Sequence, residues 1–489
     1  MGLANNCWKR KVFGIYFEIM KNNDVRDAAA RGLQDLVAWA VRQELTDIPV
    51  DVRQQTVLVI ADDLAAMLSA EDEPQVIAAH QKMLVHSPAG SASLFRRERG
   101  QLPPLQAALG NALSASWNEL DEGYRKAVCH AGLYTLPVLL AIAESENFST
   151  SDVIRASTLS YEVTARFARA WPFKTLLIHP HALFNVVGVT AAIGFLRRLP
   201  AQCMLDALSN ASTLGVVGPY SQAVRGALIR NAWAAAGISN GFQAIEWAEA
   251  GITGLAETPH DVYHEALGSE AKPSELTFEL GVDWAVSSGY HKMNACCHYA
   301  HSAIEAMAEL LAKNPHLQGG ADVVKIEIQT HRLGLTLNNF NPVTTLGAKF
   351  SLPHALAASL VYGHGGAQAF GNESLNHGQV ARLRQQVEMR LVDEELPWPQ
   401  DRPAFLKVTD SQGYHYHANC MSARGGSDRP FSDAELWAKI EDLSHASAPG
   451  LVHAMQTLHT HCVDHPDSHD LAQPWRNLVD QFFNPKQAS

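Results

Sequence analysis

The sequence predicts a mainly α protein, in which a smaller α+β lid domain is inserted into a large all-helical domain. Residues 28–252 carry apolar side chains at helical spacing and are rich in alanine. After about residue 281 the pattern changes to short stretches that alternate apolar and polar residues, which is typical of strands. Helical patterns then resume. We therefore place the helical domain at residues 25–280 and 426–489, and the lid at residues 281–425.

In the helical half, apolar residues recur at helix spacing from Leu33 to Ala40, and Pro49 falls in the connection to the next segment. The later segments are apolar on most of their surface, which suits helices inside a large bundle better than isolated amphipathic helices. The predicted helices are residues 57–68, 133–143, 153–170, 186–196, 204–214 and 231–250.

In the predicted lid, residues 323–330 (VVKIEIQT) alternate apolar and polar side chains among β-branched types, which predicts a strand. A helix is expected over residues 352–362. Three further strands are expected over residues 387–392, 405–409 and 414–418, with a turn at 411–413. Beyond the lid, Ser432 and Glu435 have the spacing of a capping box, which indicates that a helix starts there.

Composition excludes several classes of protein. A chain of 489 residues is too long for one compact core, and 47% hydrophobic with 18% charged residues argues against extensive disorder. The net charge of -12 gives no reason to expect nucleic acid or an anionic membrane as a partner. A local basic cluster can still bind an anionic substrate.

Targeting signals and cysteines indicate a cytoplasmic protein. Residues 7–20 resemble a signal peptide, but Glu18 interrupts the apolar stretch and no small-residue cleavage site follows. No uncharged apolar run reaches the ~18 residues of a membrane span. Seven cysteines, an odd number, suggest a reducing compartment and no disulfide framework.

The common cofactor and hydrolase motifs are absent from the sequence: there is no P-loop, no dinucleotide glycine fingerprint in the right context, no HExxH and no GxSxG. One segment that could carry chemistry runs from residue 118 to 132. Glu119 and Asp121 lie close to His130, just before a predicted helix, and such groups can form an acid/base pair. The alternative is a solvated acidic loop.

Two other segments offer groups that could bind a carboxylate. His179 and His181 precede an apolar helix, where they could bind an anion or relay protons, or simply cap the helix. Arg225 and Arg230 precede the helix that contains Trp233. Arginine suits two-pronged recognition of a carboxylate, although a surface helix start explains these residues equally well.

Two clusters suggest a metal but do not fit one. Residues 291–301 contain Lys292, the adjacent Cys296 and Cys297, and His301. Neighbouring cysteines do not comfortably share a tetrahedral site, and no second ligand pair completes it, so we expect no metal and favour Lys292 as a substrate-binding or proton-transferring group. The histidines at 453–469 are irregularly spaced, which indicates an exposed helix and loop.

The order of these segments resembles the MmgE/PrpD family, which includes 2-methylcitrate dehydratase, cis-aconitate decarboxylase and iminodisuccinate epimerase. The resemblance runs from about Gly32 to Phe483. It rests on several short motifs, which are Glu119 to Gly132, Ser160 to Val163, His179 to Asn185, Lys292 with Cys297 and His301, Phe350 to His354, and Arg424-Gly425 with Pro430, Ser432 and Glu435.

The resemblance implies a helical domain with an inserted α+β lid, an active site in the cleft between them, no metal or other cofactor, and a homodimer. Carried over by position, the acidic residue is Glu119 or Asp121, the histidines are His130 and His179, and the lysine is Lys292. The further residues expected to bind substrate are Arg225, Arg230, His181, His301 and His354.

The sequence departs from the family pattern at several places. A common threonine appears as Gly123, the lid tyrosine is His354, and an expected lysine is replaced by Arg225 or Arg230. The function we expect is a cofactor-independent lyase, a dehydratase or decarboxylase, acting on a small di- or tricarboxylate of the 2-methylcitrate or cis-aconitate type. The alternatives are an isomerase or epimerase that removes and returns one proton, and a non-catalytic member that binds a carboxylate.

Overall fold

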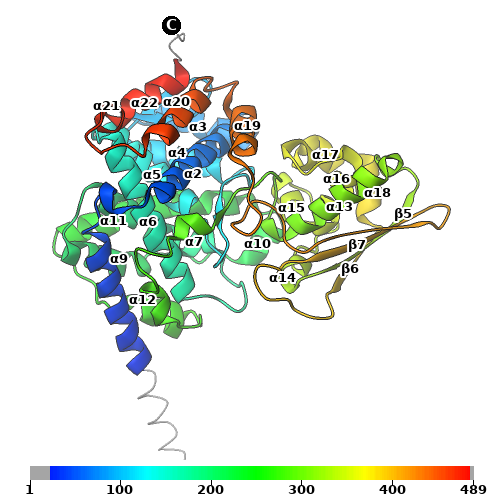
Figure 1. The fold of residues 1–489 in the computed structure, drawn as a ribbon, viewed down its shortest axis with the longest axis horizontal. Coiled ribbons are helices and arrows are strands. Elements are labelled where there is room, and N and C mark those ends of the chain that lie inside the picture. The colour runs from blue at the N-terminus through cyan, green and yellow to red at the C-terminus, as the bar shows by residue number, and fades with distance from the viewer. Residues whose placement is uncertain (1–22, 485–489) are drawn as a thin grey trace, which may run out of the picture.

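The structure of the protein is a computed structural model, and it describes residues 23–484. Figure 1 shows a large helical body and, beside it, a smaller α+β part. The helical body contains both the first and the last described segments of the chain, so the α+β part is formed by the middle of the sequence. The mainly α fold class is therefore confirmed.

The helical body is built from residues 23–40, which are helical, and from a series of longer and shorter α-helices. These are α2 (Val50–Leu68), α3 (Pro74–His86), α4 (Pro104–Ala115), α5 (Ala131–Ser145), α6 (Thr150–Ala170), α7 (Pro180–Leu183), α8 (Asn185–Leu196), α9 (Ala201–Ser212), α10 (Tyr220–Val224), α11 (Trp233–Glu249), α12 (Thr258–His260), α19 (Asp433–Ser444), α20 (Leu451–His461), α21 (His469–Ala472) and α22 (Trp475–Phe483).

Helix α8 lies at the centre of this body and packs against α5, α6, α9 and α11. Every residue of α8 is buried, as are all but the last residue of α5. This explains why both sequences are apolar on all faces, since each helix is surrounded by others. Gly188 permits a close approach of α8 to α5, because a Cβ atom there would lie only 2.6 Å from the Cβ of Tyr134.

The α+β part has one four-stranded sheet with the order β6-β5-β7-β8. Strands β5 and β6 are parallel, whereas β5 and β7, and β7 and β8, are antiparallel. The strands are β5 (Val323–Thr330), β6 (Val387–Leu391), β7 (Ala404–Asp410) and β8 (His415–Cys420). The helices are α13 (His301–Lys313), α14 (Arg332–Leu335), α15 (Thr345–Lys349), α16 (Leu352–Tyr362), α17 (Asn372–Asn376) and α18 (Gly378–Arg384).

Only one face of this sheet is covered. Ile326 and Ile328 on β5 and Leu406 and Val408 on β7 are buried, and α13 and α18 pack against the sheet. The opposite face carries charged side chains that pair across the strands, such as Lys407 with Glu327. The alternating pattern of residues 323–330 is thereby explained, because successive side chains point to opposite faces.

The buried apolar side chains form two separate clusters. The larger contains residues from Ala29 to Val286 and from Leu436 to Phe482, and the smaller contains mostly residues from Ala295 to Cys420. The two clusters follow the sequence segments that we assigned to the helical domain and to the inserted domain. The domain boundaries themselves stay a prediction.

The predicted elements agree closely with the observed ones. The strand over 323–330 and the helix over 352–362 have the predicted bounds, and the bounds of the others differ by a few residues. The largest difference is at α2, which begins at Val50 and not at the predicted residue 57. The capping box is confirmed, because the amide of Ser432 donates to Glu435 and the Ser432 hydroxyl accepts from the Glu435 amide. The signal-like segment at residues 7–20 lies outside the described residues.

Two expectations, on membrane-spanning helices and on disulfides, can be compared with the described residues. Residues 23–484 contain no helix that combines the length and the hydropathy needed to cross a membrane. The cysteines that the structure describes are all unpaired, and most of them are buried.

Replacing Gly188 with valine tests the packing at the centre of the helical body. The added side chain must displace Tyr134 or push α8 away from α5, so we expect a loss of about 1–3 kcal/mol in the free energy of unfolding. Gly378→Ala is a suitable control, because a Cβ there meets no atom within 4 Å. Equal stability of the two variants in urea denaturation would show that the centre is less tightly packed than described.

Candidate active site

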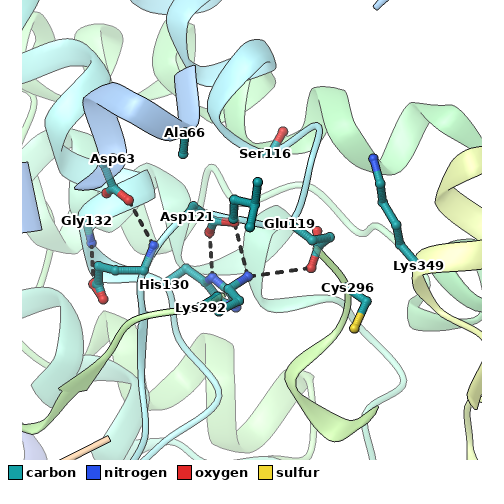
Figure 2. A network of polar contacts seen from close by, with 12 residues as sticks. Asp63, Ala66, Ser116, Glu119, Asp121, His130, Gly132, Lys292, Cys296 and Lys349 are labelled. Atoms are coloured by element: carbon teal, nitrogen blue, oxygen red, sulfur yellow. Dashed lines mark hydrogen bonds and ion pairs between the residues drawn. The ribbon is translucent and has the colours of Figure 1, made fainter. Parts of the chain in front are cut away.

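A short antiparallel ladder brings two distant charged residues together. Strand β3 (Gly123–Tyr124) pairs with β4 (Gly289–Tyr290), and Gly123 lies opposite Tyr290. When this register is continued by two residues, Asp121 falls opposite Lys292. Their side chains are in contact, since the Lys292 Nζ lies 3.2 Å from an Asp121 oxygen, and both side chains are fully buried (Figure 2).

The charges of this pair are mutually stabilised. Burial alone would raise the pKa of Asp121, but Lys292 and His130 outweigh it and hold this pKa below its usual value. Burial alone would lower the pKa of Lys292, but Asp121 and Glu119 raise it above its usual value. Asp121 is therefore an anion and Lys292 a cation throughout the physiological range of pH.

Asp121 also holds His130 in one orientation. The second oxygen of Asp121 lies 2.7 Å from the Nδ1 atom of His130, which is the N-cap residue of α5. Because the anionic carboxylate can only accept, Nδ1 carries a proton, and Nε2 is the nitrogen that can gain or lose one. His130 is a partly exposed residue that lines a cavity between the two parts of the protein. An imidazole oriented in this way is suited to proton transfer.

Arg230 is a charged residue that lines this cavity. It lies in a 3₁₀ helix over Leu228–Ala232, is 1% exposed, and forms an ion pair with Glu119. Its guanidinium group lies over the ring of Phe350, with 4.9 Å from Cζ to the ring centroid. Glu119 has a left-handed backbone with φ 55°, a conformation that costs a non-glycine residue roughly 1–3 kcal/mol and is common at functional sites.

His179 and His181 contact Arg230 directly. The Arg230 Nη2 atom lies 2.9 Å from Nε2 of His181, and the Arg230 Nε atom lies 3.3 Å from Nε2 of His179. Since arginine can only donate, Nε2 of His181 accepts. Nδ1 of His179 accepts from the backbone amide of His181 at 3.2 Å, so the proton of the neutral His179 ring is on Nε2, which contacts Arg230 without accepting from it. Burial, and then Arg230, hold the pKa of both histidines well below the usual value, so both are neutral. The Nδ1–H of His181 is then directed at the Tyr134 hydroxyl, 2.8 Å away.

The cavity has walls from both parts of the protein. The helical body contributes Glu119, His130, His179, His181 and Arg230, and the α+β part contributes His298, Tyr299, Phe350 and Arg402. Asp121 and Lys292 do not line the cavity. This differs from the expectation that Lys292 contacts substrate, because its ammonium group is directed at Asp121 and Glu119.

The donors of Asp121, His130 and His181 lie within 4.8 Å of one another, which is close enough to share a metal ion. The surrounding charges oppose a metal. Lys292 lies 3.2 Å from Asp121, and Arg230 lies 2.9 Å from His181, so two cationic groups already contact these donors. The fit to a metal is poor for this physical reason, and metal independence stays a prediction.

Three of the predicted substrate-binding residues lie outside this cavity. Arg225 is the exposed C-cap residue of α10. His301 is buried at the start of α13, and its Nε2 lies 3.2 Å from the carbonyl of Cys296. His354 is buried on α16, where its ring contacts the carbonyl of Ala369 and the side chain of Arg384. Of the two arginines that we considered as replacements for the family lysine, only Arg230 lines the cavity.

Two features of the site were not foreseen. Lys349 directly precedes the predicted Phe350 motif and is buried, with its Nζ 2.8 Å from the Asn118 side chain; burial lowers its pKa to about 8 (Figure 2). The second is the role of Gly123, where a Cβ would lie 2.6 Å from the ring of Tyr290. Tyr290 lines the cavity, so the glycine provides the space for that ring.

Behind the site lies a second group of buried carboxyls. Asp63 accepts from the backbone amide of Glu122, and Glu122 accepts from the Tyr161 hydroxyl. Burial raises the pKa of Glu122 to about 8, with Asp121 adding to the increase. Because Glu122 titrates near 4.3 in an unfolded chain, the folded state binds more protons between about pH 4.3 and 8. The contribution of Glu122 to the free energy of unfolding is therefore complete below about pH 4.3 and is lost as the pH rises toward 8.

The Glu122→Gln variant tests this assignment. Without the carboxyl, the free energy of unfolding should decline less between pH 5 and pH 8 than in the wild-type protein. Urea denaturation at several pH values measures the slope. The exposed Glu309→Gln on α13 is the control and should keep the wild-type slope. If Glu122→Gln also keeps it, Glu122 does not titrate in this window.

Family models match two successive segments of the chain. Residues 34–268 match the MmgE/PrpD N-terminal domain, and residues 295–464 match the MmgE/PrpD C-terminal domain. A cis-aconitate decarboxylase from Aspergillus terreus is 25% identical over 419 residues, which are 80% of each chain. A protein from Aspergillus oryzae named cis-aconitate decarboxylase-like protein oryM is 24% identical over 355 residues, which are 67% of this chain and 73% of that protein.

Proposed function

Since the chain belongs to the MmgE/PrpD family, we propose that it is a lyase acting on a small di- or tricarboxylate without a metal or other cofactor. The names of the Aspergillus relatives favour an acid of the cis-aconitate type and a decarboxylation. The proposal also includes the dehydration of a citrate-like acid, because both reactions require proton transfer to or from a carbon that is bonded to a carboxylate.

One observation carries this proposal. His130 is held by Asp121 so that its Nε2 atom is free, and it shares the cavity with Arg230. This combination provides a proton-transfer group beside a cation. Removal of CO2 leaves the electron pair of the broken C–C bond delocalised onto a remaining carboxylate, and a proton must then be added to carbon. We assign this proton to His130 in its imidazolium form: Nε2 takes a proton from solvent and gives it to the carbon from which CO2 has left, while Nδ1–H stays hydrogen-bonded to Asp121.

Arg230 has the complementary role of binding the carboxylate that gains negative charge. A cation that is already in position stabilises such a transition state without having to reorganise. Contacts with Glu119, His179 and His181 fix the guanidinium group before substrate arrives. Asp121 and Lys292 act on His130 from behind, as positioning residues.

We also propose that the α+β part acts as a lid. It contributes Phe350 and Arg402 to the cavity, so movement of this part relative to the helical body would open the site. A closed cavity keeps water away and strengthens the electrostatic interactions inside it.

Product analysis tests the proposed reaction. Purified, chelator-treated protein is incubated with cis-aconitate, a 2-methylcitrate and related di- and tricarboxylic acids, and products are followed by NMR and by CO2 release. Loss of one carbon or of water supports a lyase. A product with the same formula as its substrate would make the protein an isomerase, and binding without turnover would support a non-catalytic member. Activity that requires added metal contradicts the proposal.

Alanine variants test the assigned residues. His130→Ala should lower kcat/KM by about 10²–10⁴-fold, because the proton-transfer group is lost. Arg230→Ala should lower it by about 10²–10³-fold, as expected for one preorganised electrostatic contact. Steady-state kinetics with the best substrate measures both.

The matched control for Arg230→Ala is Arg225→Ala, which removes the same charge from an exposed position outside the cavity. This control should stay within about twofold of the wild-type kcat/KM. Equal losses in the two arginine variants would mean that overall charge, rather than the contact in the cavity, explains the effect.

A further inference from the structure

The α+β part contributes one cation to the cavity. Arg402 lies just before β7 and is 8% exposed. Its Nη1 atom lies 2.6 Å from Nδ1 of His298, and its guanidinium group lies over the ring of Tyr299, with 5.0 Å from Cζ to the ring centroid. All three residues line the cavity that also contains His130 and Arg230.

The charge of Arg402 is poorly compensated. Among the described residues, the charged side chains that line this cavity are Glu119, Arg230 and Arg402, and the first two form an ion pair with each other. The carboxylate beside Arg402 belongs to Asp401, 3.5 Å from Nε. That carboxylate already accepts two hydrogen bonds from Arg125, at 2.9 Å and 3.2 Å. Two arginines therefore share one anion.

Several donors around Arg402 lack an acceptor. The Arg402 Nε atom and the Tyr299 hydroxyl are both buried and make no hydrogen bond. Because Nδ1 of His298 accepts from Arg402, its proton is on Nε2, which is a further donor. Buried donors that lack a partner are costly, and an anion would satisfy them.

Arg402 also lines a second cavity. This second cavity, lined by Arg125, Lys126, Trp398 and Asp401, shares Arg402, Ala127, Val128 and Pro180 with the first. Arg402 therefore lies at the junction of the two cavities. A ligand that remains in contact with Arg402 would reach toward Arg230 from the side of the α+β part.

From this geometry we propose that Arg402, His298 and Tyr299 form a second carboxylate subsite, which binds a carboxylate of the substrate other than the one at Arg230. The subsite would select polycarboxylates over monocarboxylates. The inference rests on the proposed function, since it assumes that the cavity receives a small polycarboxylate. It also gives each part of the protein one carboxylate to bind, so that substrate would hold the two parts together.

Binding of unreactive ligands tests the subsite separately from catalysis. Tricarballylate, a saturated tricarboxylate, and butyrate, a monocarboxylate, are titrated into the wild-type protein and into Arg402→Gln by calorimetry or ligand-observed NMR. We expect Arg402→Gln to bind tricarballylate about 10- to 100-fold more weakly than the wild-type protein, which is the usual effect of losing a charge-assisted hydrogen bond. The affinity for butyrate should stay within about twofold of the wild-type value. The affinity of Arg402→Lys for tricarballylate should lie between those of the wild-type protein and Arg402→Gln.

Two further variants keep the test interpretable. Arg332→Gln, which removes an exposed arginine of the same part, should bind both ligands as the wild-type protein does. Tyr299→Phe removes one hydroxyl and should weaken tricarballylate by about 2- to 10-fold even if Arg402→Gln fails to fold.

The possible outcomes separate the two proposals. The subsite is contradicted if the wild-type protein binds butyrate as tightly as tricarballylate, or if Arg402→Gln binds tricarballylate as tightly as the wild-type protein does. It is also contradicted if Arg402→Gln lowers the affinity for both ligands equally. If tricarballylate binds through Arg402 but no polycarboxylate is converted, the subsite stands and the proposed lyase activity is wrong.

Discussion

The buried contact between Asp121 and Lys292 is the interaction on which the rest of the site depends. A carboxylate and an ammonium group removed from water are stable only when each has good partners, since desolvation of either one costs several kcal/mol. The β3–β4 ladder supplies the alignment, and His130 and Glu119 supply further contacts. Loss of either charge would leave the other buried without its main partner.

This arrangement separates the groups that hold the site from the groups that face substrate. Asp121 and Lys292 lie behind the cavity, and His130 and Arg230 line it. Arg230 is fixed by an ion pair with Glu119, by a hydrogen bond to Nε2 of His181 and by contact with the ring of His179. The catalytic candidates are thus positioned before substrate binds, which is the condition under which electrostatic stabilisation is most effective.

The order of elements and the main site residues could be predicted from sequence because they depend on local patterns. Alternation over residues 323–330 and continuous apolar character over residues 186–196 follow directly from one covered sheet face and one fully buried helix. Likewise, Asp121 and His130 are only nine positions apart. These signals exist within a short stretch of chain.

Features that depend on long-range register could not be predicted in this way. Nothing in the local sequence distinguishes Arg225, which is exposed, from Arg230, which is buried in the cavity. The role of Gly123 became clear only once Tyr290 was seen opposite it. Arg402 lies more than 100 residues from any other charged residue of the cavity, in a segment without a recognisable motif.

The central claim is that His130, held by Asp121, transfers a proton to or from carbon. The most direct measurement is the rate of deuterium incorporation into substrate or product in D2O, followed by NMR for the wild-type protein and for Asp121→Asn. We predict deuterium at a carbon next to a retained carboxylate, and a rate lower by roughly 10²-fold or more in Asp121→Asn. A decarboxylation product without deuterium from the wild-type protein, or an unchanged rate in Asp121→Asn, would contradict this assignment.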